Sequence, residues 1–204
     1  MFIGKWNKSV ILTYIGLGFA VIGMYMAIIE KNALISFMCL MIAGVCDMFD
    51  GKVARMCKRN EEEIAFGIEL DSLVDVVCFI VLPIIIYISL GFTSWYNVMS
   101  YVVFAICGIA RLGYFNVCLA DKDGKAIKYY EGLPVTVAAI TFPLMYLLSY
   151  IMSNEVFYIL FSVLILLQAL LNVLKIKIKK PSGVMYPILS VCAVVMIIIY
   201  VVLL

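Results

Sequence analysis

The chain has 204 residues, of which 66% are hydrophobic and 14% are charged, and its formal net charge is +2. Soluble domains are about half apolar and about a quarter charged, so this composition excludes an ordinary soluble protein and indicates a polytopic membrane protein. A small net charge without a basic face also argues against a nucleic-acid partner. Histidine is absent and the seven cysteines contain no CxxC pair, which excludes histidine-dependent catalysis and gives no zinc or disulfide pattern.

Seven apolar runs follow one another along the chain, and each has the roughly 20 residues that a helix needs to cross a bilayer. They cover residues 9–29, 33–56, 65–90, 94–118, 133–152, 155–174 and 184–204. Pro187 lies near the start of the last run, where membrane helices tolerate proline. We therefore expect an all-α, polytopic helical bundle of about seven transmembrane helices, six in the core and one more at the C-terminal side. Residues 1–204 are expected to form a single integral-membrane domain.

The lysines and arginines favour one orientation of this bundle. With the N-terminus inside, every lysine and arginine except Lys31 falls on inside ends or loops. Basic residues are retained on the cytoplasmic side of membrane proteins. The sequence therefore predicts a multi-pass protein of the cell membrane with a cytoplasmic N-terminus.

Four aspartates stand where the second and third runs meet. The stretches are "DMFDGKVAR" at 47–55 and "GIELDSLVD" at 67–75. Residues three and four apart share one face of a helix. One face then holds Asp47, Asp50, Gly51, Ala54 and Arg55, and the other holds Gly67, Asp71 and Asp75. We expect the last turns of one helix and the first turns of the next to bring four carboxylates into one pocket at the cytoplasmic face.

A divalent cation explains such a pocket. Each carboxylate in a bilayer costs about 2.5–3.5 kcal/mol, and hard oxygen ligands suit Mg²⁺ or Mn²⁺, while Ca²⁺ would also fit. Arg55 offers a donor fork for phosphate, and the small Gly51 and Ala54 leave room beside it. The pattern indicates a site for a metal and a diphosphate. For any one aspartate, pairing with a neighbouring lysine or arginine at the helix end remains an alternative.

These stretches resemble the motif of the CDP-alcohol phosphatidyltransferases, D-x2-D-G-x2-A-R followed by G-x3-D-x3-D. Within that family, "FGIELDSLVD", "ARLGYFNV" and "YYEGLPVTVAA" are similar to segments of the phosphatidylserine synthases. One feature departs from the family pattern, because the eleven residues between Arg55 and Gly67 make a longer spacer than usual. We expect the extra length to bulge outward, so that the two faces still meet.

The resemblance implies roles for these residues and a reaction. Asp47, Asp50, Asp71 and Asp75 would ligate one or two ions of Mg²⁺ or Mn²⁺, and Asp75 would be the general base. The CDP and diphosphate would contact Asp50, Gly51, Ala54, Arg55 and Gly67, and Thr13 on the first helix could reach the nucleotide. The implied reaction transfers the phosphatidyl group of CDP-diacylglycerol to the hydroxyl of L-serine, giving phosphatidylserine and CMP. The family also implies a homodimer.

The acceptor site has weaker signals. Arg111 and Asn116, at the inside end of the fourth helix, and Lys122, in the next loop, are candidates to bind the serine carboxylate, although a solvent or lipid-headgroup contact stays open for each. Glycerol phosphate or an inositol phosphate as acceptor would need a basic cluster beside Asp75, where the sequence continues "VVCFIVLPIII". An archaeal CDP-lipid donor stays open. A cation or proton transporter is a distant alternative, which would require an inverted repeat.

Overall fold

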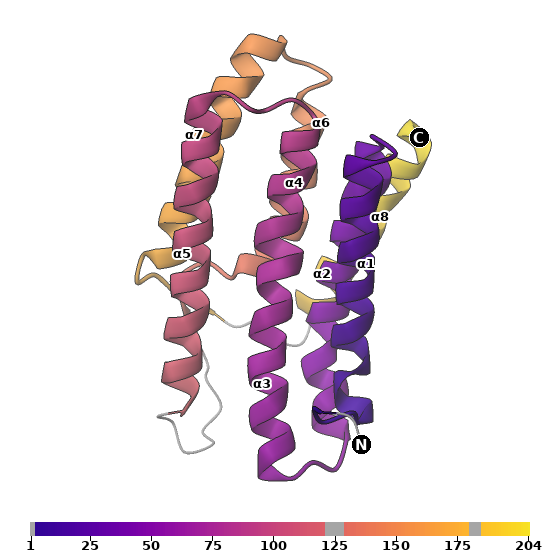
Figure 1. Cartoon of the computed structure of the whole chain (residues 1–204), viewed down its shortest axis with the longest axis vertical. Helices are drawn as coiled ribbons and strands as arrows, with labels where there is room; N and C mark the ends of the chain where they lie inside the picture. Colours follow the sequence, from indigo (N-terminus) through magenta and orange to yellow (C-terminus); the bar gives the residue numbers. More distant parts are fainter. Residues whose placement is uncertain (1–2, 121–128, 180–184) are drawn as a thin grey trace.

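The computed structural model describes residues 3–120, 129–179 and 185–204, which form a bundle of long helices (Figure 1). Most helices run along the long axis of the bundle, and the N-terminus and the α2–α3 connection lie at the same end. The helical elements are η1 (Lys8–Val10), α1 (Ile11–Ile28), α2 (Ala33–Met56), α3 (Glu61–Asp75), η2 (Val76–Val81), α4 (Leu82–Ser89), α5 (Trp95–Ala120), η3 (Val135–Val137), α6 (Ala138–Leu148), α7 (Asn154–Val173) and α8 (Met185–Leu203).

Helices lie at all seven predicted positions, and the described residues include five that are long and apolar enough to cross a membrane. These five are Lys8–Ile28, Ala33–Met56, Glu61–Ser89, Trp95–Val117 and Val156–Val173. The prediction of an all-α, multi-pass membrane bundle is confirmed.

The helix predicted at 133–152 is shorter than expected. Its apolar stretch covers Val135–Leu148, because Pro134 has an extended backbone and the Ser149 hydroxyl bonds back to the Tyr146 carbonyl at 2.6 Å. Ser190–Leu203 in α8 is likewise among the shorter apolar helices.

The connection between α2 and α3 is tighter than predicted. The expected outward bulge is wrong: the chain leaves α2 at Cys57 and re-enters a helix after Asn60. The Asn60 side chain accepts from the Glu63 N–H at 2.8 Å, and the Glu63 carboxylate accepts from the Asn60 N–H at 2.9 Å. This capping box, with glutamates near the positive end of the helix dipole, starts α3 at Glu61. The extra spacer residues thus become helix, and Asp71 and Asp75 lie beyond the first turns where they were predicted.

The N-terminal segment packs against the start of α3. Lys5 donates to the Glu62 carboxylate at 2.6 Å. This hydrogen bond raises the pKa of the Lys5 ammonium. The segment before α1 is therefore tied to the end of the bundle at which α2 and α3 meet.

A π-helix separates α3 from α4. Within Val76–Val81 the hydrogen bonds reach one residue further than in an α-helix, as in the bond from the Leu82 N–H to the Val77 carbonyl. Such wide turns are rare in proteins overall, and many of those that occur lie at functional sites. Asp75 is the residue directly before this segment.

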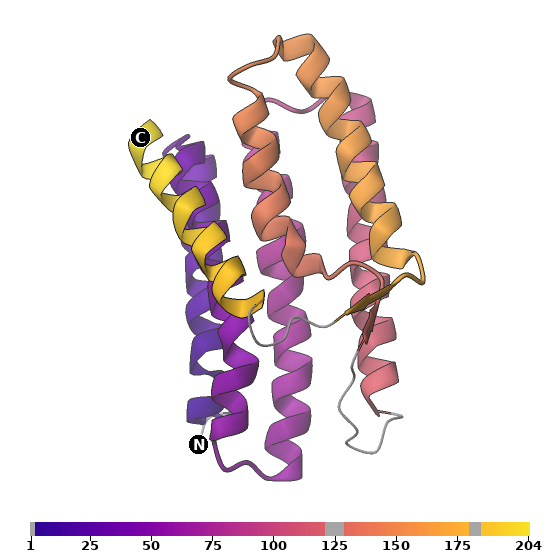
Figure 2. The ribbon, with the colours of Figure 1, turned by 180° about the vertical axis from the view of Figure 1, so that it is seen from behind.

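Buried aromatic rings form much of the core. Phe37 packs edge-on against Tyr87 and Tyr200, with ring centroids 5.5 and 5.9 Å away. The Tyr87 hydroxyl donates to the Phe142 carbonyl and the Tyr200 hydroxyl to the Pro143 carbonyl, each at 2.8 Å. These contacts fasten α4 and α8 to α6, and Figure 2 shows α8 crossing in front of α2.

Small residues let the helices approach closely, as is common in membrane bundles. A Cβ added to Gly44 on α2 would lie 2.6 Å from the Ala139 Cβ on α6, and one added to Gly16 on α1 would lie 3.3 Å from the Cys46 Cβ. These contacts fix the spacing of α2 to its neighbours on both sides.

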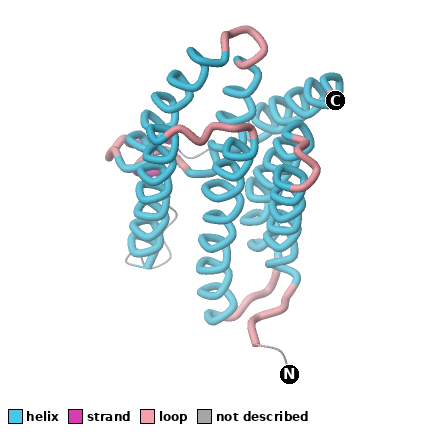
Figure 3. Tube along the Cα trace, turned by 45° about the horizontal axis from the view of Figure 1, so that its top comes forward, coloured by secondary structure: helices cyan, strands magenta, loops and turns pink. Residues whose placement is uncertain are grey.

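Two short strands, which the sequence did not predict, lie at the side of the bundle (Figure 3). β1 (Tyr129–Glu131) pairs antiparallel with β2 (Lys177–Lys179). Gly132 follows β1 with φ +79°, and a Cβ there would lie 2.3 Å from the Asn172 carbonyl oxygen. Only glycine fits this turn.

Candidate active site

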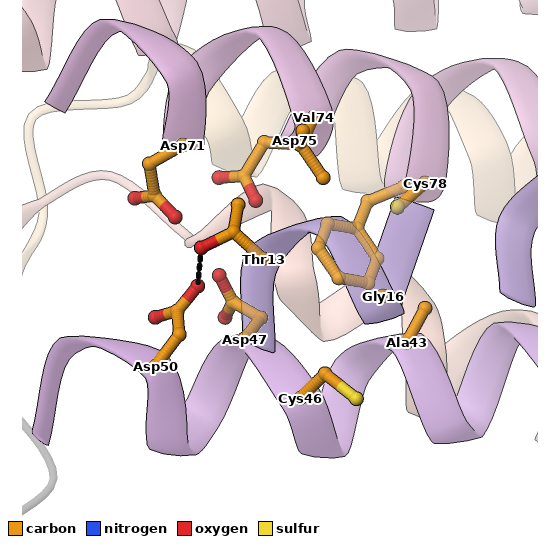
Figure 4. A pocket seen from close by; sticks show the side chains of 11 residues that line it. Thr13, Gly16, Ala43, Cys46, Asp47, Asp50, Asp71, Val74, Asp75 and Cys78 are labelled. Carbon is orange, nitrogen blue, oxygen red and sulfur yellow. Dashed lines mark hydrogen bonds between the residues drawn. The ribbon is translucent and has the colours of Figure 1, made fainter. Parts of the chain in front are cut away.

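Four aspartates from two helices point toward one another in the structure (Figure 4). Asp47 and Asp50 come from α2, and Asp71 and Asp75 come from α3. One carboxylate oxygen from each of Asp47, Asp71 and Asp75 lies within 4.8 Å of the others. The two motifs, separated by the α2–α3 connection, therefore converge on one site.

Thr13 completes this site from a third helix. Its Oγ1 donates to the Asp50 Oδ2 at 3.0 Å, and both side chains are buried. Asp50 also makes a side-chain contact with Asp71. Asp50 thus lies beside the closest group of three carboxylates and is oriented by α1.

The three converging carboxylates fit a divalent cation. Mg²⁺ and Ca²⁺ bind oxygen ligands at about 2.0–2.6 Å, so donors on opposite sides of one ion are about 4–5 Å apart. The 4.8 Å limit for Asp47, Asp71 and Asp75 matches that spacing. All three donors are hard oxygens, which favours such cations over the softer metals that prefer thiolates.

Two cavities adjoin the carboxylates. The smaller one, of about 10 Å³, is lined by all four aspartates and Thr13, and such a volume holds about one water-sized particle. The larger one, of about 450 Å³, shares Asp47, Asp50 and Asp71 with the smaller one and is not lined by Asp75 or Thr13. We call this larger cavity the α2 groove. Its other lining residues are Met41, Gly44, Val45, Met48, Gly51, Lys52, Arg55, Phe115, Pro134, Thr136, Val137, Ala139, Ile140, Cys192, Ala193 and Met196.

The residues predicted to contact a nucleotide diphosphate fall into two groups. Asp50, Gly51 and Arg55 line the α2 groove. Ala54 and Gly67 line neither of the two cavities. The Ala54 carbonyl instead accepts from the Cys57 N–H at the end of α2, and Gly67 lies near the Arg59 guanidinium. The structure therefore brings Asp50, Gly51 and Arg55 together in the α2 groove but places neither Ala54 nor Gly67 in the lining of the two cavities.

The predicted acceptor residues lie next to the same site. Arg111 is buried, its guanidinium lies 5.6 Å from the Phe115 ring centroid, and it interacts electrostatically with Asp47. Asn116 Oδ1 accepts from the Ser72 hydroxyl at 3.0 Å, which links α5 to α3 beside Asp71. Lys122 lies outside the described residues.

Some residues beside the site are not predicted by any pattern in the sequence. Phe115 lines the α2 groove and precedes the predicted Asn116 in the sequence. Ser72 lines neither cavity, and its bond to Asn116, 44 residues further on, could not be foreseen from the sequence. Cys192, Ala193 and Met196 of α8 line the α2 groove although no motif marks them. Only the packing of α8 against α2 brings them there.

The fold and site define a polytopic membrane protein with an acidic, metal-compatible cluster beside an amphipathic groove. The family model described as CDP-alcohol phosphatidyltransferase matches residues 6–174. This match covers both aspartate stretches and most of the chain, so the protein belongs to the CDP-alcohol phosphatidyltransferase family.

Curated relatives narrow the comparison. The chain is 46% identical over 100 residues to the CDP-diacylglycerol–serine O-phosphatidyltransferase of Saccharomyces cerevisiae, covering 46% of this chain and 35% of the relative. It is 33% identical over 129 residues to the archaetidylserine synthase of Methanothermobacter thermautotrophicus, covering 63% and 53%. It is 36% identical over 107 residues to the CDP-diacylglycerol–serine O-phosphatidyltransferase of Helicobacter pylori, covering 52% and 43%. The similarity thus spans between about a third and about half of these relatives' length.

Proposed function

We propose that this protein transfers the phosphatidyl group of CDP-diacylglycerol to the hydroxyl of L-serine, giving phosphatidylserine and CMP. The observation that carries the proposal is the convergence of Asp47, Asp71 and Asp75, with oxygens within 4.8 Å, at the mouth of a groove that also contains Arg55. The names of two relatives, both CDP-diacylglycerol–serine O-phosphatidyltransferases, support serine as the acceptor.

In this proposal the four aspartates hold one or two ions of Mg²⁺ or Mn²⁺. When bound, such ions stabilise negative charge on the oxygens of a transferred phosphoryl group. The hard donor set of Asp47, Asp71 and Asp75 supports this role, and Asp50, held by Thr13, would complete it.

Asp75 is the proposed general base. Phosphoryl transfer depends mainly on positioning and charge stabilisation, so one well-placed carboxylate is enough to take a proton. As the serine oxygen forms its bond to the lipid-side phosphorus, the hydroxyl proton goes to Asp75, and the bond from that phosphorus to the CMP oxygen breaks. The burial of Asp75, at 7% exposed, supports this role because bulk water is kept away from the proton.

The donor headgroup is proposed to lie along the polar part of the α2 groove. Arg55 presents a guanidinium fork suited to phosphate oxygens, while Gly51 leaves the α2 backbone open beside it. Asp50, Gly51 and Arg55 all line the groove, which supports a common ligand. Ala54, Gly67 and Thr13 would shape the surroundings of the nucleotide.

The acceptor is proposed to lie between α3 and α5. Arg111 would pair with the serine carboxylate, and Asn116, hydrogen-bonded to Ser72, would orient the amino acid beside Asp75. A burial of Arg111 to 8% exposed supports a functional role, because charged side chains in membrane helices are costly unless they are used. Lys122 stays a candidate for the same site and lies outside the described residues.

A second donor is favoured by one comparison. The archaetidylserine synthase is matched over more of this chain than the yeast enzyme, at 63% against 46%. An ether-linked archaeal CDP-lipid would place the same diphosphate beside Arg55. The headgroup chemistry is shared, so only the lipid part of the donor distinguishes the two.

The remaining proposals concern placement and assembly. The basic residues at the N-terminal end of the bundle support an orientation with the N-terminus and the site in the cytoplasm, in the cell membrane. Residues 1–204 would act as one integral-membrane domain, and two copies would form a homodimer. Cysteine accessibility from each side of intact cells and the mass of the detergent-solubilised protein test these points.

CMP release by the purified protein tests the reaction. The assay supplies CDP-diacylglycerol or its ether-linked counterpart, then serine, glycerol phosphate or inositol phosphate in turn, with Mg²⁺, Mn²⁺ or a chelator. We expect release only with serine and a divalent ion. Release in the presence of chelator, or release with another acceptor but not with serine, contradicts the proposal.

The acceptor site has its own test. Arg111→Gln is expected to raise the KM for serine by about tenfold or more, since a lost bond to a charged group costs about 1.5–3 kcal/mol. The KM for CDP-diacylglycerol should change little. Arg59→Gln, which removes a guanidinium near Gly67, is the matched control. An equal rise in both KM values would exclude a specific role in binding serine.

A further inference from the structure

The α2 groove changes character along its length. Its α2 lining follows one helical face through Arg55, Gly51, Met48, Gly44 and Met41, with the three- and four-residue steps that keep side chains on one side. Arg55 lies fourteen residues after Met41, so at a rise of 1.5 Å per residue this face is about 20 Å long. The groove therefore begins at a charged end, where Lys52 and Arg55 lie beside the aspartates, and continues along α2 into a mainly apolar end.

The apolar end has a wall supplied by α8. Cys192, Ala193 and Met196 line the groove, and α8 lies against α2 (Figure 2). Cys192, Met196 and Tyr200 are four residues apart, so they share one face of the helix. On that face Tyr200 is fully buried and donates to the Pro143 carbonyl at 2.8 Å. The wall is thus held in place by a hydrogen bond to α6.

A ligand that fills this groove must be an amphiphile with an anionic head. Its phosphate end would meet Arg55 and the carboxylate site, and its apolar part would meet methionine and alanine side chains. The volume of about 450 Å³ lies in the range of small-molecule sites, and the diphosphate of the proposed donor is continuous with its lipid chains.

We propose that one hydrocarbon chain of the CDP-lipid donor lies between α2 and α8, and that Ala193 and Met196 determine how much chain the groove accepts. The proposal rests on the proposed function, because it uses the same donor. It adds a specificity-determining role for α8, all of which lies outside the family match at residues 6–174.

The test narrows the groove and compares donors. Ala193→Phe places a ring in the groove, and Val194→Phe, on the lipid-facing side at 54% exposed, is the matched control. Met196→Ala enlarges the same end. The readout is kcat/KM for CMP release with a long-chain CDP-diacylglycerol and with a short-chain one.

We expect Ala193→Phe to lower the long-chain to short-chain ratio by about tenfold, which corresponds to about 1.4 kcal/mol or about two buried methylenes. Val194→Phe should leave the ratio unchanged, and Met196→Ala should not lower it. If wild-type and all variants release CMP with the same ratio, the inference is wrong while the proposed function stands.

A second measurement does not depend on turnover. Cys192 is exposed and lines the groove, so its rate of reaction with a maleimide reports what lies there. Long-chain CDP-diacylglycerol should slow this reaction several-fold, whereas CDP alone and long-chain diacylglycerol without the nucleotide should not. If the wild-type protein releases no CMP from any donor, the proposed function fails. The protection of Cys192 from the maleimide then still tests whether the CDP-lipid occupies the groove. Equal protection by any bilayer lipid, or none by the CDP-lipid, overturns the inference.

Discussion

Thr13→Val tests whether the bond from α1 orients the catalytic carboxylates. Thr13 Oγ1 lies 3.0 Å from Asp50 Oδ2, and each residue is 8% exposed. Valine has nearly the same shape as threonine but cannot donate, so the change removes one hydrogen bond and little packing. Hydrogen bonds to charged groups contribute about 1.5–3 kcal/mol. If that energy is used to hold Asp50 in its reactive position, kcat/KM should fall roughly ten- to hundredfold.

The assay is CMP release from CDP-diacylglycerol and serine, measured over a series of Mg²⁺ or Mn²⁺ concentrations. The half-saturating metal concentration should rise in Thr13→Val, because a less ordered Asp50 holds the ion less well. Thr13→Ser keeps the donor and should retain most of the activity. Thr93→Val, which removes an exposed hydroxyl near the Gly91 carbonyl, is a control for losing a threonine hydroxyl. Wild-type activity and metal response in Thr13→Val would refute the reasoning.

Three other changes probe the base, the helix spacing and the position of α8. Asp75→Asn should abolish turnover while CDP-lipid binding persists, so retained turnover would exclude Asp75 as the base. Gly44→Ala places a Cβ 2.6 Å from its α6 neighbour and should lower the unfolding free energy by about 1–3 kcal/mol, seen as a lower Tm. Gly18→Ala, with nothing within 4 Å, should not lower it, and an equal loss would contradict the packing argument. Tyr200→Phe removes the bond to Pro143 and should cost about 0.5–1.5 kcal/mol in thermal unfolding; no change would show that α8 is held by ring packing alone.

The helices were predictable because the bilayer imposes a minimum apolar length. The third helix is predicted to begin at residue 65, whereas α3 begins at Glu61. Asn60 followed three residues later by Glu63 is a capping-box pattern, so the local signal existed. This signal is missed when the start of the helix is taken from the apolar run alone, because the first turn of α3 consists of charged glutamates.

The carboxylate cluster was predictable for a similar reason. Asp47 and Asp50 on one helix and Asp71 and Asp75 on the next are neighbours through a short hairpin, so local periodicity was enough to bring them together. The bond from Thr13 was harder to foresee, because 37 residues separate it from Asp50.

The groove and the strand pair depend on contacts between distant segments. β1 at Tyr129–Glu131 pairs with β2 at Lys177–Lys179. The run KIKIK at 175–179 alternates between charged and apolar residues, but nothing in the sequence shows that its partner lies at residues 129–131. Met196 lines the groove beside α2 only because α8 packs against α2. Hydropathy marks α8 as apolar and says nothing of which neighbour it covers.

The π-helix between Asp75 and α4 changes the direction in which side chains point along the third spanning segment, so that α3 and α4 face different neighbours. Below it, Asp71 and Asp75 are turned toward α2; above it, Tyr87 is turned toward the aromatic rings of α6 and α7. Removing one residue from Val76–Val81 would restore regular α-helix and rotate one half against the other by about 100°. The π-helix therefore sets the rotation of α3 relative to α4. One continuous membrane helix can in this way direct its aspartates toward α2 and its tyrosine into the aromatic core.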